Sequence, residues 1–239
     1  MSYRRVLLTA ATVAAGAVYG PLLVSRRPIR RRWLPTLAGL GRPDHVALTF
    51  DDGPDIRSTP AVLDGLDRHG WKATFFMLGT MVDADPGLAK EVADRGHEVA
   101  VHGYTHQSHL RRTPSDLRAD IARAASAINR ATGQVPYWFR PPYGSLAWGS
   151  WAGAHHAELH TVLWSAWGRD WRPSRAPSEV VRDVAGQLAP GATVLLHDSD
   201  CTSAPQCWRA TVGAFDGLAE LFDRQGLTVG PLRDHGLGV

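Results

Sequence analysis

The chain has 239 residues, 44% of them hydrophobic and 21% charged, which is typical of a globular protein and excludes a disordered, low-complexity chain. Its formal net charge of +3 comes from the N-terminus, because residues 1–32 hold seven of the 26 basic residues and no acidic one. The remaining 19 basic residues face 23 acidic ones, a net charge of −4, so nucleic-acid binding by the folded part is not expected.

The N-terminal 40 residues differ from the rest of the chain. Residues 6–24 carry no charge and lie between two arginine clusters, as in a secretory signal peptide or a short membrane anchor. Ala15-Gly16-Ala17 is a candidate cleavage site. We expect a signal or anchor and basic arm over residues 1–40, with a domain outside the cytoplasm, secreted or membrane-anchored. An uncleaved run would associate the chain with a membrane; the alternative is a basic tail.

From residue 41 onward, strand and helix patterns alternate. Short apolar runs predict strands near residues 46–51, 73–78, 97–101, 137–140, 161–166, 193–197 and 227–229. Helix signals cover residues 59–69, 86–95, 113–133, 177–188 and 208–225, with a short helix after residue 140. Such alternation predicts a parallel sheet with right-handed crossovers. The chain over residues 41–239 is therefore expected to be one α/β domain with about seven parallel strands, either a barrel or an open sheet.

The first predicted strand ends in two adjacent carboxylates, Asp51 and Asp52, followed by Gly53-Pro54. Two carboxylates at one strand end repel each other unless they share a cation or a proton. The pair therefore indicates a metal or a basic partner. The alternative is an Asx-type turn, where Asp-Gly-Pro is common.

Later strand ends carry further ionisable groups, among them two histidines four residues apart. One carboxylate and two imidazoles can hold a divalent metal and leave coordination positions open for water and a substrate oxygen. The residues that would supply this set are Asp52, His102 and His106. A histidine pair of this spacing is weak evidence alone, because the chain has 11 histidines.

Five stretches in chain order carry a family resemblance: residues 49–54 (TFDDGP), 102–106 (HGYTH), 139–144 (FRPPYG), 169–171 (RDW) and 194–198 (VLLHD). They resemble the five motifs of the polysaccharide deacetylase family, carbohydrate esterase family 4, whose domain is also called the NodB homology domain. The resemblance covers roughly residues 44–230. It implies a distorted (β/α) barrel, often with fewer than eight strands.

The resemblance also implies a metal-dependent hydrolase. Zinc is the expected ion, with cobalt or another divalent ion as the alternative, and its ligands would be Asp52, His102 and His106. Asp51 would be the general base that takes a proton from the attacking water. His197 would be the general acid that protonates the leaving amine.

Five more residues receive supporting roles from the resemblance. Arg140 would hold the general base through a bidentate ion pair, and Asp170 would keep the general acid protonated. The backbone N–H of Tyr143 would stabilise the oxyanion. Trp171 and Leu195 would line the slot for the acetyl methyl group.

Three positions depart from the family pattern. Gly103 stands where the family usually has Ser or Thr, and Gln107 where it has Pro or Ser, so a hydrogen bond that supports the metal ligands could be missing. Trp167 stands where an Asp is common, and its indole could reshape the substrate groove or stack on a sugar.

Two residue types leave alternatives open. Several of the nine tryptophans lie beside the motifs and could serve as sugar platforms, although most are expected to fill the core. These candidates are Trp138, Trp148, Trp151, Trp164, Trp167, Trp171 and Trp208. Cys201 and Cys207 share one predicted loop, and their spacing permits a disulfide without requiring it.

The expected substrate is an N-acetylated amino sugar in peptidoglycan or a chitin-like glycan, from which the protein would remove acetyl groups. One alternative is an O-acetyl esterase acting on xylan-type glycans, since the same site serves both. Another is a non-catalytic carbohydrate-binding protein. A nucleotide-binding role is poorly supported, because no Gly-rich phosphate fingerprint follows a predicted strand.

Overall fold

The computed structural model describes residues 27–238. The apolar run at residues 6–24 and the candidate cleavage site lie outside these residues. Within the described part, no helix is both long enough and apolar enough to span a bilayer.

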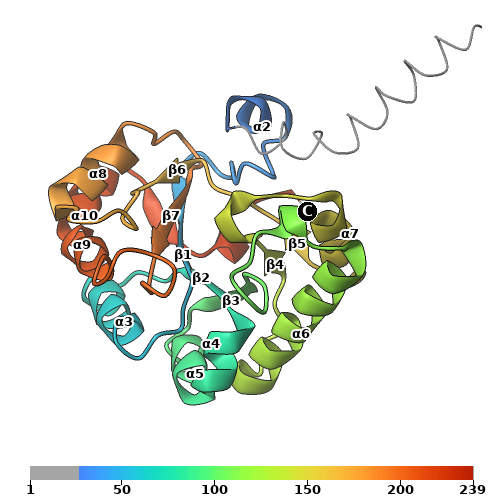
Figure 1. The fold of residues 1–239 in the computed structure, drawn as a ribbon. Helices are drawn as coiled ribbons and strands as arrows, with labels where there is room; N and C mark the ends of the chain where they lie inside the picture. The colour runs from blue at the N-terminus through green and yellow to red at the C-terminus, as the bar shows by residue number, and fades with distance from the viewer. Residues whose placement is uncertain (1–26, 239) are drawn as a thin grey trace, which may run out of the picture.

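Eight short strands form one sheet, and every pairing in it is parallel. Its strands are β1 (His45–Asp51), β2 (Thr74–Met77), β3 (Glu98–Val101), β4 (Trp138–Phe139), β5 (His160–Thr161), β6 (Ala166–Trp167), β7 (Thr193–His197) and β8 (Thr228–Gly230). The order is β5-β4-β3-β2-β1-β7-β6, and β8 also pairs with β1. Helices surround these strands (Figure 1), which confirms the predicted α/β fold and the distorted barrel. Within residues 27–238 no pairing joins β5 to β6, so the barrel is open there.

The helices largely follow the predicted pattern. They are α2 (Arg27–Trp33), α3 (Thr59–Arg68), α4 (Gly79–Ala84), α5 (Pro86–Asp94), α6 (Pro114–Thr132), α7 (Trp148–His156), α8 (Pro177–Ala185), α9 (Trp208–Gly213) and α10 (Phe215–Arg224). The longest, α6, is capped at its N-terminus by Thr113, whose side chain accepts a hydrogen bond from the Asp116 N–H, and at its C-terminus by Gly133, which has a φ of 72°. Helix α4 was not predicted. The helix predicted over residues 208–225 is two helices, which meet at Ala214.

The strand predicted over residues 161–166 is also two pieces, β5 and β6. Between them, the carbonyl oxygens of Val162 and Leu163 accept hydrogen bonds from the buried guanidinium of Arg140. The Leu163 N–H donates to the carbonyl of Leu37 instead of to a strand. These partners replace the sheet ladder, and the extended run breaks there.

Strand β1 is buried along its whole length and divides its side chains between two layers. Leu48 and Phe50 belong to the large core between the sheet and the helices. Ala47 belongs to a smaller core inside the barrel, and Thr49 also hydrogen-bonds to the buried guanidinium. Because side chains alternate along a strand, Asp51 faces the barrel interior as well.

Residues N-terminal to β1 pack onto the domain. Leu37 and Ala38 are buried, and Leu37 packs with Leu146 and Leu163. The carbonyl oxygen of Gly39 accepts a 2.7 Å hydrogen bond from the Thr193 hydroxyl. The packed part of the chain therefore extends to the N-terminal side of the predicted boundary at residue 41.

Candidate active site

Strand register brings the motif residues together at one edge of the sheet. In the β1–β7 pairing, Asp51 and His197 are Cα partners. In the β3–β4 pairing, the partners are the residues immediately before His102 and Arg140. Parallel strands present their carboxyl ends at the same edge, so ionisable side chains from four strands meet there.

Asp52, His102 and His106 form a cluster that can hold a metal ion, with ligand atoms that all lie within 4.8 Å of one another. The Oδ1 atom of Asp52 lies 3.3 Å from Nε2 of His102 and 3.2 Å from Nε2 of His106. Nδ1 of His102 lies 2.8 Å from the Arg140 carbonyl oxygen, which can only accept. In the neutral ring the proton is thus on Nδ1, and the Nε2 lone pair faces the cluster.

The surroundings of Asp52 fit a cation. Its side chain is almost completely buried, and Oδ1 accepts no hydrogen bond within the described structure. Burial would raise the pKa of Asp52, but the two imidazoles hold it well below its ordinary value. Burial would lower the pKa of His102, but Asp51 and Asp52 together raise it. A buried, ionised carboxylate that faces two imidazole nitrogens is a donor set for a divalent ion.

The loop that carries the two histidines is held by Asp120, which sequence reasoning missed. Its carboxylate accepts from the Tyr104 N–H at 2.6 Å and from the Thr105 hydroxyl at 3.2 Å. Gly103 has a φ of 105°, which glycine adopts readily and other residues rarely do. The departure at Gly103 therefore suits this backbone, and the Asp120 carboxylate supports the loop.

Arg140 is completely buried and contacts the first carboxylate of the pair. Its Nη1 donates to Oδ1 of Asp51 at 2.6 Å and to the Thr49 hydroxyl at 2.9 Å. The predicted bidentate ion pair is wrong, because Nη2 and Nε are taken by the carbonyl oxygens of Leu163 and Val162. The single contact leaves Oδ2 of Asp51 on the side of the metal cluster, 3.8 Å from Nε2 of His102.

Asp170 is buried, and it forms the second ion pair with His197, which is only partly exposed. Nδ1 of His197 lies 2.9 Å from Oδ1 of Asp170, and the His197 backbone N–H donates to Oδ2 at 2.7 Å. Oδ2 also accepts from the Thr211 hydroxyl at 2.7 Å. Burial alone would lower the pKa of His197, but the charge and hydrogen bond of Asp170 raise it to about 10. Thr211 was not predicted, because an isolated threonine in a helix carries no sequence signal.

A pocket of about 380 Å³ opens over these groups. The predicted substrate contacts Tyr143, Trp171 and Leu195 all line it, and so do Trp164 and Trp167. The wall also includes Gly144, the last residue of the third motif, and Thr202 and Ser203, which the sequence did not indicate.

Not all of the candidate sugar-binding tryptophans line the pocket, and the two cysteines are not bonded to each other. Trp138 is buried in the core, whereas Trp148 and Trp151 are exposed on α7. Cys201 and Cys207 are free thiols. The permitted disulfide is therefore not formed.

Comparisons with known proteins find a matching family and similar named proteins. The sequence profile of the polysaccharide deacetylase family matches residues 39–162. A peptidoglycan-N-acetylglucosamine deacetylase from Bacillus cereus is 36% identical over 64% of this chain and 56% of its own length. A chitooligosaccharide deacetylase from Bradyrhizobium is 39% identical over 78% of this chain and 88% of its own.

Solved structures show the same relationship. The crystal structure of the Bc1960 peptidoglycan N-acetylglucosamine deacetylase superposes with a TM-score of 0.77 at 29% identity, over 85% of this chain and 95% of that one. The chain spans only part of the Bacillus cereus relative and most of the rhizobial one. On the profile match and these identities, the chain belongs to the polysaccharide deacetylase family.

Proposed function

We propose that this protein is a metal-dependent deacetylase that removes acetyl groups from N-acetylated amino sugars in peptidoglycan or chitin-like glycans. The observation that carries the proposal is that one pocket is lined by the metal-binding cluster and by Asp51 and His197, each of which is held in an ion pair, with Arg140 and with Asp170. The similar proteins from Bacillus cereus and Bradyrhizobium are named as deacetylases of such glycans, which supports the substrate class.

Zinc is the metal that we propose for the Asp52, His102 and His106 cluster. Two imidazoles and one carboxylate form a three-ligand set that suits zinc and leaves coordination positions open. Cobalt, which accepts similar ligands, is the first alternative. A divalent ion held there lowers the pKa of water and polarises a carbonyl oxygen.

Asp51 and His197 divide the proton transfers between them. Oδ2 of Asp51 is the free carboxylate oxygen and accepts a proton from the water that attacks the acetyl carbonyl carbon. His197 is protonated because Asp170 raises its pKa to about 10. It donates that proton to the amide nitrogen as the carbon–nitrogen bond breaks, and the products are acetate and the free amine.

Aromatic and apolar side chains bind the substrate. Trp171 and Leu195 form the apolar wall against which the acetyl methyl group rests. Trp164 and Trp167 offer indole faces to the sugar rings. The backbone N–H of Tyr143, which has a φ of 60°, stabilises the oxyanion.

We also propose that the protein acts outside the cytoplasm, secreted or held to the membrane by residues 6–24. The uncharged run between arginine clusters and the candidate cleavage site support this location. A cell-wall polymer would be accessible there.

The test is acetate release from N-acetylglucosamine oligomers by the full-length chain, stripped of metal and then given zinc, cobalt or nothing. Release that depends on the added ion supports the proposal. If zinc binds and no acetate appears from these oligomers but acetylated xylan is hydrolysed, the O-acetyl esterase alternative is correct. If glycans bind and no substrate is hydrolysed with any ion, the protein is a carbohydrate-binding module.

The role of His197 separates the two hydrolytic reactions. An amide requires a better proton donor at its leaving group than an ester does. His197→Ala should therefore abolish amide hydrolysis and only weaken hydrolysis of an acetyl ester. Equal losses on both substrates would contradict the role of His197 as general acid.

A further inference from the structure

The two carboxylate oxygens of Asp52 have different surroundings. Oδ1 faces Nε2 of His102 and of His106 and accepts no hydrogen bond in the described structure. Oδ2 accepts a hydrogen bond from the hydroxyl of Thr202 at 2.9 Å. Thr202 lies in the loop between β7 and α9, 150 residues away in sequence, and none of the five family motifs includes it.

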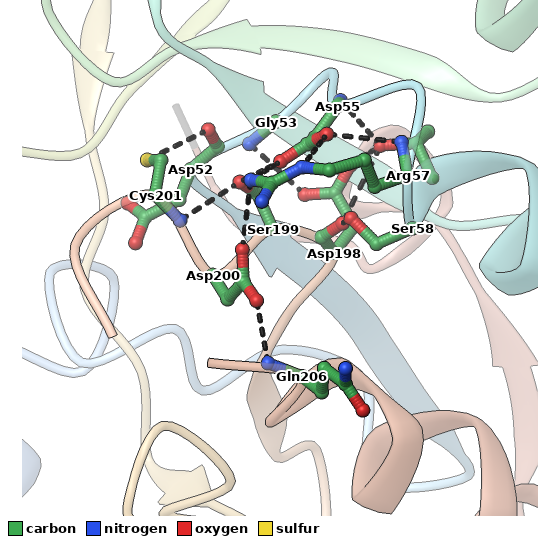
Figure 2. A network of polar contacts seen from close by, with 11 residues as sticks. Asp52, Gly53, Asp55, Arg57, Ser58, Asp198, Ser199, Asp200, Cys201 and Gln206 are labelled. Carbon is green, nitrogen blue, oxygen red and sulfur yellow. Dashed lines mark hydrogen bonds and ion pairs between the residues drawn. The ribbon is translucent and has the colours of Figure 1, made fainter. Parts of the chain in front are cut away.

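The loop that carries Thr202 is fastened to the loop that follows β1. Figure 2 shows this network: Nε and Nη2 of Arg57 donate to the two carboxylate oxygens of Asp55, at 3.1 and 2.7 Å. Nη2 of Arg57 also donates to Oδ1 of Asp200 at 2.9 Å, and thereby joins the two loops. Oδ2 of Asp200 accepts from the Gln206 N–H, which closes the far side of the Thr202 loop.

Two further contacts fix the residues just before Thr202. The Ser199 hydroxyl donates to Oδ2 of Asp55 at 3.1 Å and accepts from the Cys201 N–H at 3.1 Å. The Cys201 thiol donates to the backbone carbonyl of Asp52 at 3.6 Å. The backbone just before Thr202 is therefore held against the segment that begins with Asp52.

We propose that Thr202 is a positioning residue for the metal ligand Asp52, and that Arg57 acts through Thr202 by holding its loop in place. The inference rests on the metal site of the proposed function. With Oδ2 bonded to the hydroxyl, only Oδ1 of Asp52 would be available to an ion. The hydrogen bond opposes rotation of the carboxylate, so coordination positions would stay open for water and for the acetyl oxygen.

The exposure of Thr202 and Arg57 bears on whether their loss would affect metal binding or the stability of the fold. Thr202 is exposed, so loss of its hydroxyl should leave the fold intact, and a change in zinc affinity in Thr202→Val would reflect the site itself. The Arg57 side chain is 65% exposed, but its partners Asp55 and Asp200 are only 5% and 8% exposed. Loss of Arg57 leaves these carboxylates without their cation, so the unfolding free energy of Arg57→Gln is measured beside its zinc affinity.

The test measures metal binding by the full-length chain without substrate. Zinc affinity is determined by competition with a chromophoric chelator, and the coordination environment by the visible absorption of bound cobalt(II). Thr202→Val removes the hydroxyl and keeps the side-chain shape. It should weaken zinc binding about tenfold and change the cobalt spectrum, because the loss of a hydrogen bond to a metal ligand typically costs 10- to 100-fold in metal affinity. Thr202→Ser should restore both.

The matched control is Thr228→Val. Thr228 is also exposed, and its hydroxyl donates to the Asp44 carbonyl at the opposite end of β1. This substitution should leave zinc affinity unchanged. If Thr202→Val binds zinc within threefold of the wild type and gives the same cobalt spectrum, the positioning role is refuted. Tighter zinc binding would refute it too.

A double-mutant cycle tests the role of Arg57. Arg57→Gln should weaken zinc binding several-fold in the wild type and have no further effect in Thr202→Val, because contacts that act through one another are not additive. If the fold-losses of zinc affinity in the two single variants multiply in the double variant, a role of Arg57 that acts through Thr202 is refuted. Failure of the wild-type chain to bind zinc or cobalt would refute the metal site, whereas normal metal binding without deacetylation would count against the proposed reaction alone.

Discussion

Replacement of Asp170 by asparagine should move the pH range in which the protein is active. Asp170 is buried beside His197, and its charge and hydrogen bond outweigh burial and raise the pKa of that imidazole from 6.5 to about 10. A rise of this size corresponds to about 5 kcal/mol of preference for the protonated ring. In Asp170→Asn the carboxylate charge is gone while the desolvation of His197 remains. Its pKa should therefore fall to about 6.5 or below.

The sign of the pH effect follows from the role of His197 as an acid. The group is active when protonated, so activity is present below its pKa and is lost as the pH rises through it. The alkaline limit of acetate release should fall by at least two pH units in Asp170→Asn. At pH 8 the rate should drop by about 10²-fold or more, the usual contribution of a general acid. Acetate release from N-acetylglucosamine oligomers, followed from pH 5 to 10, measures both.

Thr211→Val supplies the matched control. It removes one hydrogen bond to Asp170 and keeps the carboxylate charge, so the alkaline limit should move by less than one pH unit. The reasoning is refuted if Asp170→Asn keeps the wild-type alkaline limit, or if both variants shift it equally. Unchanged zinc affinity in Asp170→Asn would show that the loss does not arise at the metal site.

Three further predictions concern the buried arginine, a histidine pair at the other end of β1 and the pocket wall. Arg140→Gln leaves a buried carboxylate without its cation and should cost about 3–5 kcal/mol in urea unfolding, and a loss below 1 kcal/mol would contradict the buried ion pair. His45 and His235 share a buried 2.8 Å contact between their Nδ1 atoms, and burial lowers the pKa of His235 to about 4. Because the unfolded chain binds this proton at a higher pH than the folded one, the free energy of unfolding is at its full value above pH 6.5. It should fall by about 3 kcal/mol as the pH drops from 6.5 towards 4. The urea midpoint of His235→Asn should depend less steeply on pH than that of the wild type, and an equal slope would argue against this pair. Gly144→Ala would place a methyl group 2.7 Å from the Trp164 indole at a φ of 62°, so kcat/KM should fall at least tenfold, and a normal value would show that the indole position is unimportant.

The sequence predicted those parts of the site that strand order determines. Asp51, His102, Arg140 and His197 each follow an apolar run, and parallel strands must bring their carboxyl ends to one edge. The apolar runs therefore predicted that these residues lie at one edge of the sheet, and the motif resemblance supplied their expected roles. The register that makes Asp51 and His197 direct neighbours was not visible, because it depends on how the strands pair across the sheet.

The parts that were missed depend on contacts between distant loops. Asp120 lies on a helix and reaches the loop of the metal-binding histidines, and Thr202 reaches Asp52 from a loop far along the chain. Neither residue has a periodic or motif signal of its own. The single-nitrogen contact of Arg140 was likewise unpredictable, since it depends on carbonyl oxygens that become free only where the sheet breaks after β5.

Acetate release by Asp51→Asn, compared with the wild type at equal zinc occupancy, tests the proposed reaction most directly. The side chains have nearly the same shape, but the amide cannot accept the proton from water. The full-length wild type with bound zinc should release acetate from N-acetylglucosamine oligomers, and the variant should bind zinc and release at least about 10²-fold less. Comparable rates from the two proteins, with zinc bound to both, would contradict Asp51 as the base and the mechanism built on it.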